Sequence, residues 1–263
     1  MKWIEKYSTV LRISLQNTFV YRSNAVGGLL FYSLFIFVFF NLWRAIYQGG
    51  EVAGYSLTQM VWYLCMTELI VFGCKSSVFG QMNEDVKSGS IAYQLNRPYH
   101  YIIYQFSNAL GGMIFNLLIY GTMAIILGLI MVGPIPGFRI SALPFGLFSA
   151  VLGITINFFF MMVLGLTAFR LEENTAFFLI YQKLVFMLGM FIPLEFLPKW
   201  LQSIARCLPF SYVAWAPARL IVAFSWDFFW QVIPMQLLWI FISIILSVSM
   251  YSYGVKGIQA HGG

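Results

Sequence analysis

Apolar residues in this chain of 263 residues gather in long stretches that short polar segments separate. A helix needs ~20 mostly apolar residues to cross the hydrocarbon core of a bilayer. Backbone polar groups cannot remain unpaired in lipid, and runs such as AIILGLIMV lack the two-residue alternation of a membrane strand, so each span must be helical. The fifth span is short and is closed by Pro193. The pattern predicts six spans, at about 25–46, 55–74, 106–132, 143–169, 176–192 and 228–253.

A different pattern precedes the first span. Between residues 1 and 24, apolar side chains such as Trp3, Tyr7, Leu11 and Leu15 recur at helical spacing, with polar residues on the other face and Ile13 breaking the pattern. This is typical of an amphipathic helix that lies in the membrane interface. We expect it to anchor the protein and to pack on it rather than to be a dedicated binding site.

Composition supports the same class. Apolar residues make up 60% of the chain and charged residues only 9%, against ~25% charged in soluble domains. A soluble enzyme, a disordered protein and a secreted disulfide scaffold are therefore excluded. We expect an all-α integral membrane protein in which residues 1–263 form a single transmembrane domain.

The distribution of basic residues predicts the orientation. The net charge of +6 does not indicate a nucleic-acid partner, because most Lys and Arg residues lie beside apolar spans. With the N-terminus in the cytoplasm, nine basic residues lie inside and five outside. We therefore expect a multi-pass protein of the bacterial inner membrane with both termini cytoplasmic.

Catalytic and cofactor signatures are missing from the sequence. The three cysteines and two histidines have no metal-ligand spacing and form no disulfide framework. The string Gly73-Cys74-Lys75-Ser76 lacks the spacing of a phosphate-binding P-loop. Both aspartates and both histidines lie outside the spans, which argues against an intramembrane enzyme. We expect neither a catalytic site nor a cofactor on this chain.

Three connecting segments carry the polar or irregular features. The predicted inner segment 75–105 is the longest, and the second inner loop is the short string RLEENT, with Arg170, Glu172 and Glu173. The outer region 193–227 is too apolar for a plain loop, yet several prolines interrupt it. Because proline breaks helices, we expect short re-entrant helices there.

Two of these segments resemble the permease subunit of a type-2 ATP-binding-cassette exporter, the branch described as ABC-2 family transporter protein. The first is Asp85-Val86-Lys87-Ser88-Gly89-Ser90, which runs into Leu95-Asn96-Arg97-Pro98. The second is Phe191-Ile192-Pro193-Leu194-Glu195-Phe196-Leu197-Pro198-Lys199-Trp200-Leu201, followed by Ile204-Ala205 and by Leu208-Pro209-Phe210-Ser211-Tyr212. The resemblance covers essentially the whole chain.

The resemblance implies a function and a set of partners. The first segment would be the helix that couples the permease to a separate ATPase subunit, which would bind ATP and Mg. Two permease copies, or this chain and a related one, would form the pathway and export a lipophilic or amphipathic compound such as a drug or antibiotic. The candidate coupling residues are Asn83, Glu84, Asp85, Lys87, Gly89, Arg97 and Pro98, and the outer residues are Pro193, Glu195, Pro198, Trp200 and Pro209. Asn83 and Glu84 are included because, with Asp85 and Lys87, they supply polarity and can start a helix, although an ordinary solvated inner loop would also explain this segment.

Polar residues inside the predicted spans leave an alternative open. Glu68 and Lys183 lie near mid-membrane, and Asn157 adds a further polar position. Charges in hydrocarbon are costly, so such residues are candidates for a transport pathway, although an ion pair, a snorkelling lysine or interhelical hydrogen bonds would also explain them. The alternative function is a stand-alone ion-coupled transporter or channel that uses Glu68 and Lys183.

Overall fold

The computed structural model describes residues 2–20, 23–47, 50–74, 78–95, 97–171 and 173–261. Within these ranges the chain is helical, and its only β-type pairing is a single bridge between Val52 and Tyr55. The predicted all-α class is therefore confirmed. The helices are α1 (Lys2–Val20), α2 (Ser23–Tyr47), α3 (Leu57–Gly73), α4 (Val78–Lys87), α5 (Ile91–Leu95), α6 (Tyr101–Val132), η1 (Ile140–Ala142), α7 (Leu143–Leu166), η2 (Thr167–Phe169), α8 (Thr175–Val185), η3 (Phe186–Met190), η4 (Leu194–Phe196), α9 (Lys199–Cys207), α10 (Pro209–Val213), α11 (Trp215–Val222) and α12 (Trp226–His261).

Five helical segments of the described chain are long and apolar enough to cross a membrane. They are Val26–Tyr47, Leu57–Lys87, Tyr101–Val132, Ile140–Phe169 and Trp226–Lys256, and residues 75–77 inside the second are not described. The predicted fifth span at 176–192 corresponds to the apolar helix Thr175–Met190, which is shorter than the other five. A crossing there remains a prediction, whereas the multi-pass membrane character of the chain is clear.

Two helix boundaries differ from the prediction. The segment 75–105 contains the helices α4 and α5, where a polar helix was expected, and α6 begins at Tyr101 rather than near residue 106. Burial of Tyr101, Ile102 and Gln105 against neighbouring helices explains the earlier start. The last helix does not end near residue 253 but continues to His261.

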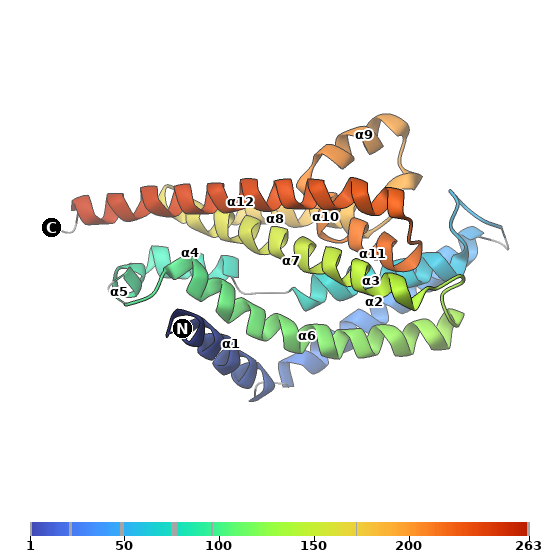
Figure 1. The fold of residues 1–263 in the computed structure, drawn as a ribbon, viewed down its shortest axis with the longest axis horizontal. Helices are drawn as coiled ribbons and strands as arrows, with labels where there is room; N and C mark the ends of the chain where they lie inside the picture. The colour runs from blue at the N-terminus through green and yellow to red at the C-terminus, as the bar shows by residue number, and fades with distance from the viewer. Residues whose placement is uncertain are drawn as a thin grey trace.

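The helix α1 docks on the N-terminal half of α6 (Figure 1). Ser14 Oγ donates a hydrogen bond of 2.5 Å to the carbonyl of Asn108, and the Lys6 ammonium donates to the carbonyl of Pro98. The close approach requires Gly111, since a Cβ there would lie 2.5 Å from the carbonyl oxygen of Leu11. The predicted amphipathic helix therefore exists and packs on the bundle, and its interfacial position stays a prediction.

The bundle has two distinct ends (Figure 1). One end, here called the terminal end, carries α1, α4, α5 and the last turns of α12. The opposite end carries the turn at 50–56 and the connection at 133–139, while α9 stands out from the side of the bundle. In the core, α3 lies buried between α2, α6 and α11, and α7 packs against α12, α11 and α4. The two motif-bearing segments thus lie in different parts of the molecule.

Candidate functional site

The first candidate site is the α4–α5 element at the terminal end. Gly89 separates the two helices with a φ of +74°, in the left-handed region that glycine adopts without strain. Asp85 holds the turn from within, because its carboxylate accepts hydrogen bonds from Ser90 at 2.9 Å and from the Tyr101 hydroxyl at 2.6 Å. The Tyr101 hydroxyl also accepts a hydrogen bond from Gln105. Asp85 is therefore a positioning residue that ties the turn to the start of α6.

The other predicted coupling residues divide into exposed and enclosed groups. Glu84 is exposed, and its carboxylate forms no hydrogen bond or ion pair with any described residue. Asn83 is half-buried, and its side-chain oxygen is without a partner in the described part of the chain. Arg97 and Pro98 are exposed beyond α5. The exposed charged side chains of this element are thus Glu84 and Lys87 on α4 and Arg97 beyond α5.

The second predicted inner loop lies beside the first. Lys87 Nζ of α4 is 3.9 Å from Glu173 Oε2, and the rings of Phe79 and Phe178 stack with centroids 4.2 Å apart. The exposed ion pair contributes little to stability. The hydroxyl and backbone N–H of Thr175, together with Lys87, lower the pKa of Glu173 from its usual value. The predicted residue Glu172 lies outside the described residues.

Arg170, the remaining residue of that loop, faces the last helix instead of α4. Its guanidinium lies 4.1 Å from the ring centroid of Tyr253 on α12. The turn before it is well held, since the buried Asn174 donates hydrogen bonds to the Leu164 carbonyl and to Thr167 Oγ1. The two predicted inner loops are therefore neighbours, but Arg170 and Glu173 point to different helices.

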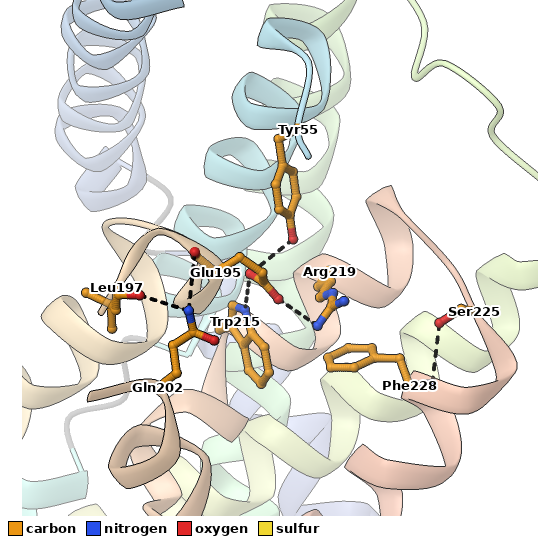
Figure 2. Close-up of polar contacts among 8 residues, drawn as sticks. All are labelled: Tyr55, Glu195, Leu197, Gln202, Trp215, Arg219, Ser225 and Phe228. Atoms are coloured by element: carbon orange, nitrogen blue, oxygen red, sulfur yellow. Dashed lines mark hydrogen bonds and ion pairs between the residues drawn. The ribbon is translucent and has the colours of Figure 1, made fainter. Parts of the chain in front are cut away.

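The second candidate site surrounds Glu195 in the predicted outer region (Figure 2). Glu195 Oε1 lies 2.6 Å from Nη1 of Arg219, and Oε2 accepts hydrogen bonds of 3.3 Å from the Tyr55 hydroxyl and from Trp215 Nε1. The Arg219 guanidinium stacks over Phe228, 3.9 Å from its ring centroid. We call Tyr55, Glu195, Trp215, Arg219 and Phe228 the Glu195 cluster; it joins η4, α11, α12 and the turn before α3.

Local structure explains how these side chains meet. Pro193 and Pro198 adopt the same extended conformation, with φ −56° and ψ 145°, and each precedes a short helix. Gln202 donates to the carbonyls of Glu195 and Leu197 and so closes the turn that carries the carboxylate. On the other side, burial and then the carboxylate of Glu195 raise the pKa of the Tyr55 phenol, which therefore stays protonated and donates.

The other outer residues have simpler environments. Pro193 is buried, and Pro209 is buried at the first position of α10, where proline needs no N–H partner. Pro198 and Trp200 are exposed. The region therefore contains short helices, of which η4, α9 and α10 follow or begin with a proline while α11 does not. That these helices are re-entrant stays a prediction.

The three predicted intramembrane residues do not form one site. Glu68 is fully buried, and neither carboxyl oxygen has a hydrogen-bond partner among the described residues. Lys183 is exposed on α8 and lies beyond 4 Å of every described carboxylate. Asn157 accepts a hydrogen bond of 3.0 Å from the Tyr181 hydroxyl, which is an interhelical bond between α7 and α8. The structure thus pairs neither Glu68 with Lys183 nor Asn157 with either of them.

Sequence reasoning did not identify the partners of Glu195. Arg219 counted only as one of five outer basic residues, although it lies within the apolar string AWAPARLIVAF, where a charge needs a partner. Tyr55 is 140 residues away from Glu195, and nothing in the local sequence connects the two. The outer carboxylate and the apolar context of Arg219 were the only signals available.

Comparisons with known proteins identify the family of this chain. No match appears among the curated proteins. The family model described as ABC-2 family transporter protein matches residues 29–262, a stretch that includes both motif segments and nearly all of the apolar helices. The chain therefore belongs to the ABC-2 transporter family, as a multi-pass membrane component of a transporter and not as a catalytic subunit.

Proposed function

We propose that this chain is the permease subunit of an ATP-driven exporter of the bacterial inner membrane. It forms the translocation pathway with a second copy or a related permease, and a separate ATPase subunit drives it. Both termini lie in the cytoplasm, so the terminal end of the bundle faces the ATPase. The observation that carries the proposal is the α4–α5 element, a well-held polar projection at this end.

The element has the properties that a docking helix needs. Its base is rigid, since Asp85 bridges Ser90 and Tyr101, and its turn is closed by Gly89. Glu84 on α4 is exposed, and its carboxylate has no partner among the described residues. This carboxylate is therefore available to pair with a basic residue of an ATPase. Because α4 also packs on α7 and η2, a displacement of this element by the ATPase would move α7 directly.

Energy for transport comes from the partner. This chain carries no P-loop, so ATP and Mg bind to the ATPase subunit. Closure of two ATPase subunits on ATP would favour one of two permease conformations by binding it more tightly. Coupling then needs only a difference in how the α4–α5 element contacts the ATPase in the two states.

Exposed apolar faces of this chain support the proposed substrate class. The described part of α2 exposes a long apolar face, with Leu30, Leu34 and Phe37 each more than half exposed. A pathway formed between such faces suits a lipophilic or amphipathic compound, such as a drug or antibiotic, that enters from the inner leaflet. Family membership supports the direction of export.

Reversal of one exposed charge tests the docking surface. Glu84→Lys should reduce co-purification of the ATPase subunit and ATP-driven export at least fivefold, because it places a like charge against a basic docking site. The chain should stay folded, since the exposed Glu84 carboxylate forms no hydrogen bond or ion pair with a described residue. The measurement is affinity purification from native membranes in mild detergent, with quantitative mass spectrometry and an ATPase assay.

Glu51→Lys is the matched control, because Glu51 is an exposed glutamate in the turn at 50–56, and this turn lies at the opposite end of the bundle (Figure 1). It should leave ATPase recovery unchanged. Equal recovery with wild type and Glu84→Lys would reject α4 as the docking surface. A clean preparation without any ATPase would reject the exporter proposal itself.

The ion-coupled alternative makes a different prediction for Glu68. This carboxyl group has no partner among the described residues, so Glu68→Gln removes no hydrogen bond or ion pair. In an ATP-driven permease we expect export to stay within about twofold of wild type, whereas a carrier that uses Glu68 to bind a proton or cation would lose transport. Uptake or efflux in vesicles, energised either by ATP or by an imposed proton gradient, distinguishes the two.

A further inference from the structure

A cavity at the terminal end lies between the end of α7 and the last turns of α12. Its volume is about 300 Å³, and it is open to the surroundings. Leu166, Phe169 and Met250 form apolar walls, while Arg170, Ser249 and Tyr253 supply polar groups. The cavity shares no residue with the Glu195 cluster or with the α4–α5 element.

Close packing of α7 and α12 shapes the floor of this cavity. A Cβ added to Gly254 would lie 2.2 Å from the ring of Phe169, so the glycine allows this ring to lie directly against α12. Ser249 and Tyr253 are four residues apart and therefore share one face of α12. The cavity, here called the groove, thus lies between α12 and the end of α7 together with η2 and the turn that follows it.

The polar groups of the groove comprise one cation, Arg170, and two hydroxyls, and no described carboxylate pairs with the cation. Arg170 stacks on Tyr253, but no described carboxylate lies within 4 Å of its guanidinium. The hydroxyls of Ser249 and Tyr253 form no hydrogen bond with any described residue. The nearby Glu173 is occupied with Thr175 and Lys87, and Glu172 is outside the described residues. A ligand that pairs with the Arg170 guanidinium in this groove would carry negative charge and acceptor oxygens.

Position determines what kind of anion fits. The groove lies where two candidate spans end, at Phe169 and at Lys256, so its apolar walls continue toward the membrane interior and its arginine lies at the level of a membrane surface. A guanidinium matches the geometry of phosphate oxygens, and basic pockets between membrane helices bind acidic head groups. The apolar side chains of Leu166, Phe169 and Met250 suit an acyl chain better than a hydrated free anion.

We propose that this groove is a binding site for one anionic phospholipid. The phosphate accepts hydrogen bonds from Arg170 and from the hydroxyls of Ser249 and Tyr253. The first part of an acyl chain lies along Leu166, Phe169 and Met250. The bound lipid would join α7 to α12 at the end of the bundle where α4 packs on α7, independently of which partner drives transport.

Lipid titration followed by native mass spectrometry tests the proposal. The protein, depleted of lipid in detergent, is titrated separately with dioleoyl phosphatidylglycerol and dioleoyl phosphatidylcholine. We expect the first phosphatidylglycerol to bind at least fivefold more tightly than phosphatidylcholine. Arg170→Gln should weaken phosphatidylglycerol binding about fivefold and leave phosphatidylcholine binding unchanged.

Two further variants distinguish the effect of the Arg170 charge from the effect of the shape of the groove. Arg139→Gln is the matched control, since Arg139 is an exposed arginine in the connection at 133–139, which lies at the opposite end of the bundle (Figure 1). This variant should retain full selectivity. Ser249→Leu keeps Arg170 but fills part of the groove, so it should weaken binding of both lipids. Gel filtration and circular dichroism verify that each variant is folded, and Ser249→Leu remains informative if Arg170→Gln does not fold.

Three outcomes would overturn the proposal. Equal selectivity for phosphatidylglycerol over phosphatidylcholine in wild type and Arg170→Gln would show that Arg170 in the groove does not recognise the head group. Complete displacement of the lipid by millimolar inorganic phosphate would identify a free-anion site instead. Loss of the first lipid from dimeric but not monomeric species would show that a second copy of the chain covers the groove.

Discussion

Arg219→Met should destabilise the folded protein by about 2–3 kcal/mol, because it leaves the Glu195 carboxylate largely enclosed without its cation. Glu195 and Arg219 side chains are only 18% and 26% exposed, and their charged atoms lie 2.6 Å apart. Tyr55 and Trp215 would still donate hydrogen bonds to the carboxylate, which keeps the loss below that of a fully buried pair. Thermal unfolding in detergent should show a midpoint roughly 5–10 °C lower.

A double-mutant cycle isolates the contribution of the pair. Glu195→Gln alone should cost less, since Arg219 keeps its stacking on Phe228, and the double variant Glu195→Gln/Arg219→Met should recover part of the loss. Arg139→Met serves as the control, because this exposed arginine has no described ion-pair partner, and its unfolding midpoint should not change. Strictly additive effects of the two substitutions would mean that the ion pair does not hold the outer region together.

Gly153→Ala should have an effect of similar size for a steric reason. Gly153 lies in α7 where α10 crosses it, and a Cβ there would be 2.4 Å from the Val213 carbonyl oxygen and 2.8 Å from that of Tyr212. These are backbone atoms, and the Tyr212 carbonyl also accepts a hydrogen bond from Gln236 of α12, so they cannot move aside without loss. Such overpacking costs about 1–3 kcal/mol, and we expect the upper end.

Gly27→Ala is the matched control for this substitution. Gly27 also lies in a membrane-spanning helix, but a Cβ there has no atom within 4 Å. The control should leave the unfolding midpoint unchanged or raise it slightly, because alanine restricts the unfolded chain. Limited proteolysis between α9 and α11 reports on the same contact, and equal protection of Gly153→Ala and wild type would contradict the expected displacement of α10.

The two candidate sites differ in how far the sequence predicts them. The turn between α4 and α5 was foreseeable, because a polar helix, a glycine and then Pro98 follow one another along the chain. The different roles of its two acidic residues were not foreseeable. The Asp85 carboxylate accepts hydrogen bonds from Ser90 and Tyr101, while the carboxylate of the adjacent Glu84 has no described partner. Neighbouring acidic residues look equivalent in a sequence, and only the packing of α6 against this turn distinguishes them.

The intramembrane charges were considered as a possible pair, but the structure separates them. Glu68 and Lys183 suggested a pair because each interrupts an apolar run at similar depth, yet Glu68 faces the core and Lys183 faces outward. Hydropathy gives the depth of a residue in a span but contains no information on its direction around the helix axis relative to other helices. The true ion pair of the outer region, Glu195 with Arg219, lay in a segment where prolines obscure the periodicity.

The amino-acid sequence by itself determined the class of the protein, the positions of its long apolar helices and the proline-interrupted region before α12. These properties depend on length, periodicity and backbone chemistry within a few successive residues, which lipid enforces strictly. The tertiary structure alone decided that Tyr55 and Arg219 meet at Glu195, that α1 docks on α6 at Gly111, and that Arg170 faces a groove beside Tyr253. Those arrangements join residues far apart in the chain, and they arise from the relative rotation and approach of whole helices, which no local pattern encodes.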